Sequence, residues 1–166
     1  MHWCISAELE NPVNLEKGRL LAILPKWGKF FQVEADITIT KFSSTWISIF
    51  HFTQSNNNLK YVGDRQPMLK IYKDDYFHIC SGINSNMNWC QNYGGIKLNT
   101  KYHIVIQQYP YHSHAYYRIL VNGAVFKGVE NKSPKDYSSV YVYASNPWYT
   151  SFKNYGKLEN FKFRYW

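Results

Sequence analysis

The stretch Gln32–Thr40, QVEADITIT, alternates apolar and polar residues without a break. Its apolar members are Val33, Ala35, Ile37 and Ile39. Successive side chains of an extended strand point to opposite faces, so residues two apart share a face. The stretch therefore predicts a β-strand with one buried face and one face in water.

Strand-like segments continue along most of the chain. Thr45–Thr53 is rich in β-formers on both faces and ends in the loop composition of Gln54–Asn58. We predict further strands at Pro67–Tyr72, Tyr76–Cys80, Met87–Asn92, Tyr102–Tyr109, Tyr116–Val121, Ala124–Gly128, Ser139–Ser145 and Leu158–Tyr165. Arg19–Leu24 and Phe161–Trp166 are strand-like too, and we expect these two end segments to pair with each other.

The turns between these segments favour the same class. Asn122-Gly123 supplies the positive φ angles of a two-residue hairpin, and Asp74-Asp75 and Gly94-Gly95 mark two further turns. No full window shows helical periodicity. About ten short strands, spaced by about 8 to 12 residues and without the Cys-Trp-Cys pattern of an immunoglobulin domain, favour an all-β, two-sheet antiparallel jelly-roll sandwich. The 166 residues carry no internal repeat or composition break, so we expect one domain over residues 1–166.

The net charge of +8 favours acidic partners such as sulfated glycans, anionic membranes or nucleic acid. The basic residues are scattered, which is typical of a solubilising surface, and they form no recognisable nucleic-acid-binding fingerprint. We therefore expect no nucleic acid partner. No apolar run reaches about 18 residues, so we expect no transmembrane segment. The N-terminus lacks the features of a signal peptide, so the chain either stays in the cytosol or begins after cleavage.

Two of the three cysteines, Cys80 and Cys90, flank the turn-rich stretch Ser81–Asn88. This spacing lets them face each other across a hairpin and form a disulfide, which would leave Cys4 unpaired. Two reduced cysteines packed in the core are the alternative. Three cysteines without a CxxC motif make metal binding a poor explanation.

Six motifs in order resemble a concanavalin A-like jelly roll of the laminin G type, as found in secreted and matrix proteins of invertebrates. They are Phe50–Thr53 (FHFT), Gly63–Pro67 (GDRQP), His78–Ser81 (HICS), Ile104–Gln108 (IVIQQ), Val121–Gly123 (VNG) and Val140–Trp148 (VYVYASNPW). They lie within residues 30 to 165, nearly the whole chain.

The resemblance implies a secreted, extracellular binding or cell-adhesion module in which the Cys80–Cys90 pair is oxidised. Domains of this type often hold calcium at one rim, and some bind sulfated glycans. The match is incomplete, since Asp64, Asp74 and Asp75 are the acidic residues in the central half of the chain and form no spaced cluster. Calcium is therefore left open, and we expect no cofactor.

Sugar recognition needs aromatic faces against the pyranose ring and planar polar groups for its hydroxyls. Two clusters offer such groups. The central cluster is His51, Asn56, Asn58, Asp64 and Arg65, and the rim cluster is Asn86, Asn88, Trp89, Asn92 and Tyr93. From them we predict the ligand-binding residues Arg65, Asp64, His51, Asn56, Asn58, Trp89, Asn88 and Tyr93. The alternatives are that the asparagines only form turns, that Trp89 packs in the core, and that Arg65 forms a salt bridge with Asp64.

The sequence shows no pair of acidic residues, no nucleophile beside a base and no complete set of metal ligands. His112-Ser113-His114 lacks a third ligand, and an exposed tyrosine-rich loop is the simpler interpretation of that segment. We therefore expect no catalytic residues, no metal and no enzyme activity.

These observations predict a non-catalytic extracellular recognition module, a lectin whose partners are glycans or glycoproteins, sulfated or acidic glycans among them. A protein-binding adhesion or matrix module is the first alternative, and a polysaccharide-acting enzyme on the same fold is the second. Sandwich lectins gain avidity when their sheet edges pair into a homo-oligomer, but the sequence does not show whether an edge is free.

Overall fold

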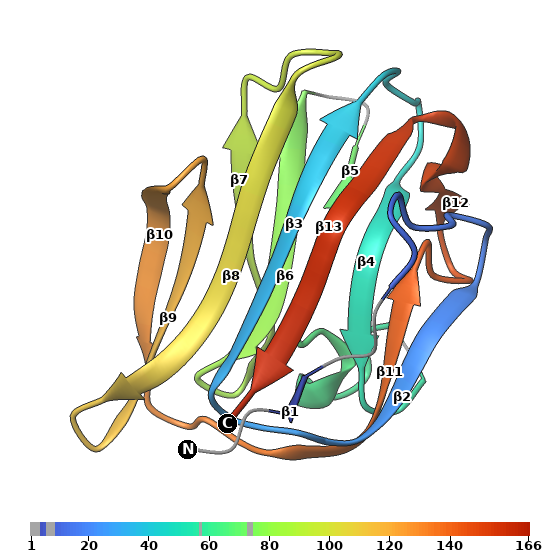
Figure 1. Ribbon diagram of the computed structural model, residues 1–166. Coiled ribbons are helices and arrows are strands. Elements are labelled where there is room, and N and C mark those ends of the chain that lie inside the picture. The colour runs from blue at the N-terminus through green and yellow to red at the C-terminus, as the bar shows by residue number, and fades with distance from the viewer. Residues whose placement is uncertain (1–3, 6–8, 57, 73–74) are drawn as a thin grey trace.

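The computed structural model describes residues 4–5, 9–56, 58–72 and 75–166, and nearly all of its regular structure is extended (Figure 1). The strands are β1 (Cys4–Ile5), β2 (Arg19–Trp27), β3 (Phe31–Ile39), β4 (Ile47–Thr53), β5 (Met68–Ile71), β6 (Tyr76–Ile83), β7 (Asn86–Gly94), β8 (Lys101–Tyr111), β9 (His114–Val121), β10 (Ala124–Asn131), β11 (Tyr137–Ala144), β12 (Thr150–Ser151) and β13 (Gly156–Tyr165). Two short 3-10 helices, η1 (Val62–Asp64) and η2 (Phe152–Asn154), complete the set. The described part of the chain contains no helix that could cross a membrane.

The strands form two sheets that lie face to face (Figure 1). The six-stranded sheet has the order β1-β13-β3-β8-β9-β10 and lies in front in Figure 1. The seven-stranded sheet has the order β2-β11-β4-β5-β6-β7, with β12 added parallel to β4. All other pairs are antiparallel, so the predicted all-β, two-sheet jelly-roll sandwich is confirmed.

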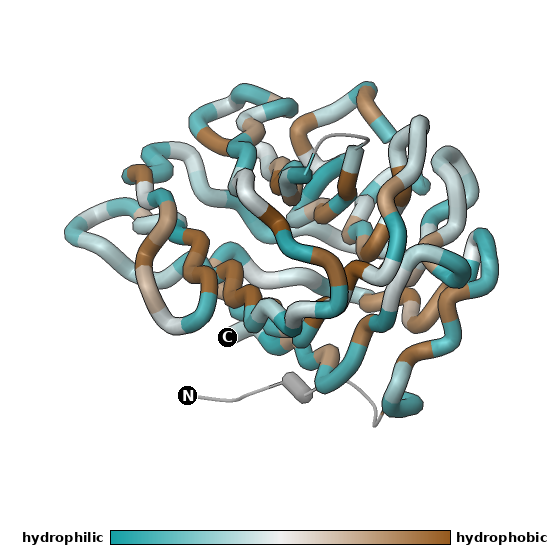
Figure 2. Tube along the Cα trace, turned by 90° about the horizontal axis from the view of Figure 1, so that it is seen from above, coloured by the Kyte–Doolittle hydropathy of each residue, from teal (hydrophilic) through white to brown (hydrophobic). Residues whose placement is uncertain are grey.

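Strand β3 shows why the sheets stack. Its burial alternates residue by residue from Phe31 to Ile39, as the sequence predicts. Figure 2 shows the same alternation of hydrophobic and hydrophilic residues along other strands. The buried side chains of both sheets meet in one apolar cluster, because only stacking removes every inner face from water.

Aromatic rings dominate the centre of that cluster. Phe52 on β4 is fully buried, and its ring centroid lies 4.9 Å from that of Trp27 on β2 and 5.2 Å from that of Phe163 on β13. On the same strand Phe50 stacks on Phe161 of the opposite sheet at 5.1 Å. These contacts fix the seven-stranded sheet on the six-stranded one.

The expected pairing of Arg19–Leu24 with Phe161–Trp166 is wrong. The first segment belongs to β2, which pairs with β11, whereas the second belongs to β13, which pairs with β3 and β1 in the other sheet. Strand β13 has neighbours on both sides, so it offers no edge to β2. A position near a chain end therefore did not indicate the partner of a strand.

Two of the predicted turns can be compared with the structure. Asn122 and Gly123 join β9 to β10 with φ angles of 51° and 82°, which confirms the predicted hairpin. Gly95, directly after β7, has a φ of 75°. The third expected turn includes Asp74, which lies outside the described residues.

Replacing Phe52 by Ala tests the central contact between the sheets. We expect the free energy of unfolding to fall by about 3 to 5 kcal/mol, because the change leaves a cavity among Trp27, Phe161 and Phe163. Urea denaturation measures the loss. Val125→Ala at a residue that is 57% exposed is the control, and an equal effect of both changes would contradict this account of the core.

Candidate functional site

The outer face of the seven-stranded sheet, which points away from the core, carries two rows of aligned side chains. One row follows the pairs Tyr143↔His51, His51↔Met68, Met68↔Cys80 and Cys80↔Cys90 across five strands. The other row follows Lys70↔His78 and His78↔Asn92 across β5, β6 and β7. Residues directly opposite each other share a face of the sheet, so strand pairing alone brings polar groups from five strands together.

Arg65, directly after η1, extends its side chain over this face. Its Nε donates to the backbone carbonyl of Asn58 at 3.0 Å, and its Nη2 donates to Asn58 Oδ1 at 3.3 Å. Its Nη1 donates to Asn88 Oδ1 on β7. The residue is only 4% exposed, and burial lowers the pKa of its guanidinium from the ordinary value. Arginine nevertheless stays charged at neutral pH, so all these acceptors are neutral groups around a positive charge.

Lys70 on β5 lies beside Arg65. Its Nζ lies 4.0 Å from the ring centroid of Trp46 and 4.5 Å from that of Tyr149, so both rings stabilise the ammonium group. Burial, and then repulsion by Arg65, lower the pKa of Lys70 to about 7. Burial is also the main reason why the pKa of His78 is lowered, and the charges of Lys70 and Arg65 lower it further. Arg65 and Lys70 therefore lie close enough on this face to repel each other.

The hydroxyl oxygen of Tyr149 is the point where the donors of this face meet. Asn58 Nδ2 donates to it at 2.6 Å, Lys70 Nζ at 3.3 Å and Arg65 Nη2 at 3.4 Å. A phenol oxygen has two lone pairs, so it cannot accept all three bonds with good geometry. The two cations make the two long contacts.

An aromatic group borders the cations. The ring of Trp46 lies 4.3 Å from that of Tyr72, 4.9 Å from that of His78 and 6.5 Å from that of Tyr76, measured between centroids. All four residues are half-buried, and Asn88 and Asn92 nearby are exposed. We call Trp46, Tyr72, Tyr76, Tyr149, Asn58, Arg65, Lys70, His78, Asn88 and Asn92 the outer-face cluster.

His51 holds the two loops of this cluster in place. Its Nε2–H donates to the backbone carbonyl of Asp64 at 2.5 Å, and its Nδ1 accepts from Asn146 Nδ2 at 2.8 Å. A carbonyl oxygen can only accept, so the ring carries its hydrogen on Nε2. Asn146 Oδ1 in turn accepts from the backbone N–H of Tyr149 at 3.1 Å. The neutral ring thus ties the loop of Arg65 to the loop of Tyr149.

Asp64 has internal partners as well. Its carboxylate accepts hydrogen bonds from the Ser55 hydroxyl and from the backbone N–H groups of Lys60 at 2.6 Å and Tyr61 at 2.8 Å. It forms no salt bridge with Arg65, so that alternative interpretation is wrong. The carboxylate holds the loop before η1, and this loop places the backbone of Arg65.

The structure divides the predicted clusters. Of the rim cluster, Asn88 and Asn92 lie on the outer face, whereas Trp89 and Tyr93 point into the core. Trp89 packs edge-on against Tyr117, and Tyr93 packs against Phe126. The residues of the rim cluster are therefore divided between the two faces of β7, because neighbouring residues of a strand face opposite ways, and ligand contact at Asn88, Trp89 and Tyr93 stays a prediction. 

In the central cluster Asn58 and Arg65 belong to the outer-face cluster, whereas His51 is fully buried beneath it. Asn56 accepts a hydrogen bond from the Tyr143 hydroxyl at the edge of this region. Ligand contact at each of these residues stays a prediction.

The predicted disulfide between Cys80 and Cys90 is present, and it joins directly paired residues of β6 and β7. His78, Cys80 and Cys90 are the only group of three metal-binding residue types close together in the described part of the chain. The disulfide occupies both sulfur atoms, so this group fits no metal while it is oxidised. The side chain of Cys4 lies outside what the structure describes.

The other metal candidates have different partners. His114 Nδ1 lies 3.0 Å from Glu130 Oε1, while His112 occupies the exposed turn after β8. Asp64 is bonded as described above, and Asp74 lies outside the described residues.

Four important residues were missed by the sequence analysis: Trp46, Lys70, His78 and Tyr149. Lys70 was treated as part of a scattered basic surface, although it is only 5% exposed. Its position between Leu69 and Ile71 in a strand that is buried throughout is a signal that could have singled it out. Nothing in the sequence around Tyr149 places its hydroxyl beside Arg65, because 84 residues separate the two.

Gly82 on β6 packs closely against the backbone of the loop that carries Arg65. The N–H of Gly82 donates to the carbonyl of Arg65 at 3.0 Å. A Cβ at this position would overlap the carbonyl oxygen of Val62 and the Nε2 of Gln66.

Gly82→Ala should therefore displace the Arg65 loop and lower the free energy of unfolding by about 1 to 3 kcal/mol. Urea denaturation measures this. Gly94→Ala is the matched control, since a Cβ there meets no atom within 4 Å. Equal stability of the two variants would show that the loop does not depend on this contact.

Burial lowers the pKa of His51 to about 3 from its ordinary 6.5. The unfolded chain therefore binds a proton at His51 below about pH 6.5 that the folded chain does not bind. Between pH 6.5 and 3 this linkage lowers stability by up to about 1.4 kcal/mol per pH unit as the pH falls. We expect His51→Gln to remove this part of the pH dependence, measured by urea denaturation at several pH values. His112→Gln in the exposed turn should keep the wild-type slope.

No family model matches the chain, and no curated protein matches its sequence. Solved structures do match its fold. Trypanosoma rangeli sialidase matches with a TM-score of 0.57 and 15% identity over 96% of this chain and 27% of the sialidase. The receptor binding domain of botulinum neurotoxin D matches with a TM-score of 0.56 and 11% identity, over 98% of this chain and 43% of the toxin chain.

An alginate lyase from Alteromonas sp. 272 has a TM-score of 0.51 and 11% identity, over 98% of this chain and 93% of the lyase. The chain thus spans about a quarter of the sialidase and less than half of the toxin domain. At these identities the likeness shows a shared β-sandwich fold.

Proposed function

We propose that this protein is a non-catalytic recognition module that binds carbohydrate on the outer-face cluster. The observation that carries the proposal is the arrangement of aromatic rings and polar donors on one sheet face. Trp46 and Tyr149 flank Lys70, and the side-chain amides of Asn58 and Asn88 lie beside Arg65. Rings can cover the apolar side of a pyranose while amide and guanidinium groups bond its hydroxyls.

The fold is compatible with this function. Proteins that share the fold include a sialidase, a toxin receptor binding domain and an alginate lyase. A fold does not by itself determine function, so the support for the proposal lies in the cluster. The disulfide fits an oxidising, extracellular environment, and with it we propose that the chain is a secreted, laminin G-like lectin.

A protein-binding adhesion module is the first alternative. Such a module would use a broad face, with many contacts of similar importance. A polysaccharide-acting enzyme is the second alternative, which two of the structural neighbours favour. The carboxylate next to Arg65, that of Asp64, is fully engaged with Ser55, Lys60 and Tyr61, which supports a role without general acid catalysis.

A glycan array tests the proposal, with Trp46→Ala as the site variant. We expect the wild-type protein to bind one class of glycan, and Trp46→Ala to weaken that binding at least about tenfold through loss of an aromatic contact. Tyr111→Ala is the control, because Tyr111 is an aromatic residue on β8 of the other sheet and is 40% exposed. 

Three results would count against the proposal. The absence of binding to any neutral or charged glycan would refute carbohydrate recognition. Binding that depends on Tyr111 and not on Trp46 would place the site on the hairpin of β8 and β9. Turnover of a bound polysaccharide by protein purified from two different hosts would contradict the non-catalytic role.

A further inference from the structure

Arg65 and Lys70 are two neighbouring cations that form no ion pair with a carboxylate of the described residues. Among the residues that the structure describes, seven contacts within 4.0 Å join a basic side chain to a carboxylate, three of them through histidine, and neither Arg65 nor Lys70 takes part in one. Asp64 is next to Arg65 in sequence, but its carboxylate accepts from Ser55 and two backbone N–H groups instead. Asp64 therefore acts on Arg65 only through its field, and no described carboxylate lies within 4.0 Å of either cation.

Such an arrangement costs free energy. Each cation has left water, and a buried charge without a counter-charge is unfavourable even where neutral groups bond it. The lowered pKa values of Lys70 and His78 have the same origin. An anion bound here would relieve the repulsion between Arg65 and Lys70, so the site favours a negatively charged ligand over a neutral one.

The geometry also indicates where the anion would be bound. Asn58 Nδ2, Lys70 Nζ and Arg65 Nη2 all point at the Tyr149 hydroxyl oxygen, and the two cations reach it only at 3.3 and 3.4 Å. An anionic oxygen makes shorter and stronger bonds to such donors than a phenol oxygen does. Tyr149 lies in the loop after β11, so its ring can turn aside without breaking a strand.

We propose that Arg65 and Lys70 bind the anionic substituent, a carboxylate or a sulfate, of an acidic carbohydrate. This inference rests on the proposed function, because the rings of Trp46, Tyr72 and Tyr76 would contact the sugar that carries the anion. Carboxylate and sulfate share the negatively charged oxygens that the donors require. A planar carboxylate pairs better with the fork of one guanidinium, and sulfate offers a third oxygen to Lys70.

The test uses dextran, carboxymethyl dextran and dextran sulfate of equal chain length, which differ only in the substituent. Binding is measured by calorimetry at about pH 6, where Lys70, with its pKa of about 7, is charged. We expect the wild-type protein to bind at least one of the charged polymers at least about tenfold more tightly than dextran. The charged polymer that binds more tightly shows whether the site prefers carboxylate or sulfate.

Lys70→Met is the main variant, because Met keeps the volume and removes a charge whose burial is costly, so the fold is retained. We expect it to weaken binding of the charged polymer about tenfold. Arg65→Gln should have the same effect. Lys162→Met on the exposed side of β13 in the other sheet changes the net charge equally and should alter binding by less than about twofold.

Equal losses in Lys70→Met and Lys162→Met would show that only the overall charge attracts the polymer, and would overturn the inference. Failure of the wild-type protein to prefer either charged polymer to dextran would do the same. The proposed function has its own readout: neutral glycans that bind through Trp46 and are unaffected by Lys70→Met would leave carbohydrate recognition in place and remove only its acidic specificity.

Discussion

The rest of the structure depends on the burial of β4 on both of its faces. All seven residues of this strand are buried. On the inner face, Phe50 and Phe52 pack against the opposite sheet. On the outer face, His51 lies beneath two loops, to which it is bonded through Asp64 and Asn146. Those loops carry Arg65 and Tyr149 and lie over the outer face of β4. The candidate site therefore depends on the burial of the same strand that packs into the core.

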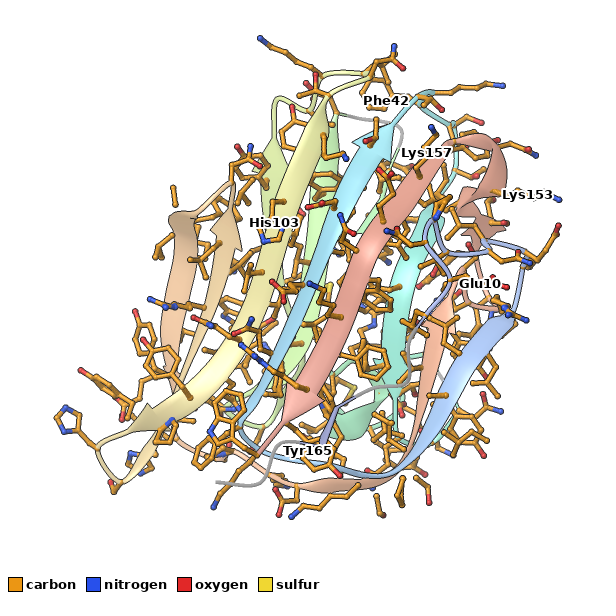
Figure 3. All side chains as sticks on the ribbon, viewed as in Figure 1. Glu10, Phe42, His103, Lys153, Lys157 and Tyr165 are labelled. Carbon is orange, nitrogen blue, oxygen red and sulfur yellow. A yellow bond between two sulfur atoms is a disulfide. The ribbon has the colours of Figure 1, made fainter. Side chains whose placement is uncertain are left out.

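The two charged side chains of this loop, Asp64 and Arg65, have different kinds of partner. Its carboxylate, that of Asp64, receives hydrogen bonds from backbone N–H groups and a hydroxyl, which satisfies an anion well. Its cation has only amide, carbonyl and phenol oxygens as acceptors, and Lys70 nearby relies mostly on aromatic rings. On the opposite face of the molecule, where Figure 3 labels His103 of β8, basic side chains do have carboxylate neighbours, and Lys101 Nζ lies 3.3 Å from Glu159 Oε2. The outer-face cluster thus holds two largely buried cations that have no carboxylate within 4.0 Å among the described residues.

Much of the fold could be predicted from local sequence. The alternation in Gln32–Thr40, the Asn122-Gly123 turn and the Cys80–Cys90 hairpin all correspond to elements of the structure, because each depends on residues close together in the chain. The partner of β2 could not be predicted in this way. Strand-like composition shows that a segment is extended, but it does not show which edge of which sheet it joins.

The sequence by itself indicated a β-sandwich and a hairpin across which Cys80 and Cys90 can pair, and it singled out Arg65 and several asparagines as candidate ligand contacts. Only the tertiary structure decided which of the nearby residues act together. It turned Trp89 into the core while Asn88, one residue earlier, contacts Arg65. It also brought Tyr149 to Lys70 from 79 residues away. Backbone alternation is a local property, whereas the meeting of distant loops depends on the register and order of the strands beneath them.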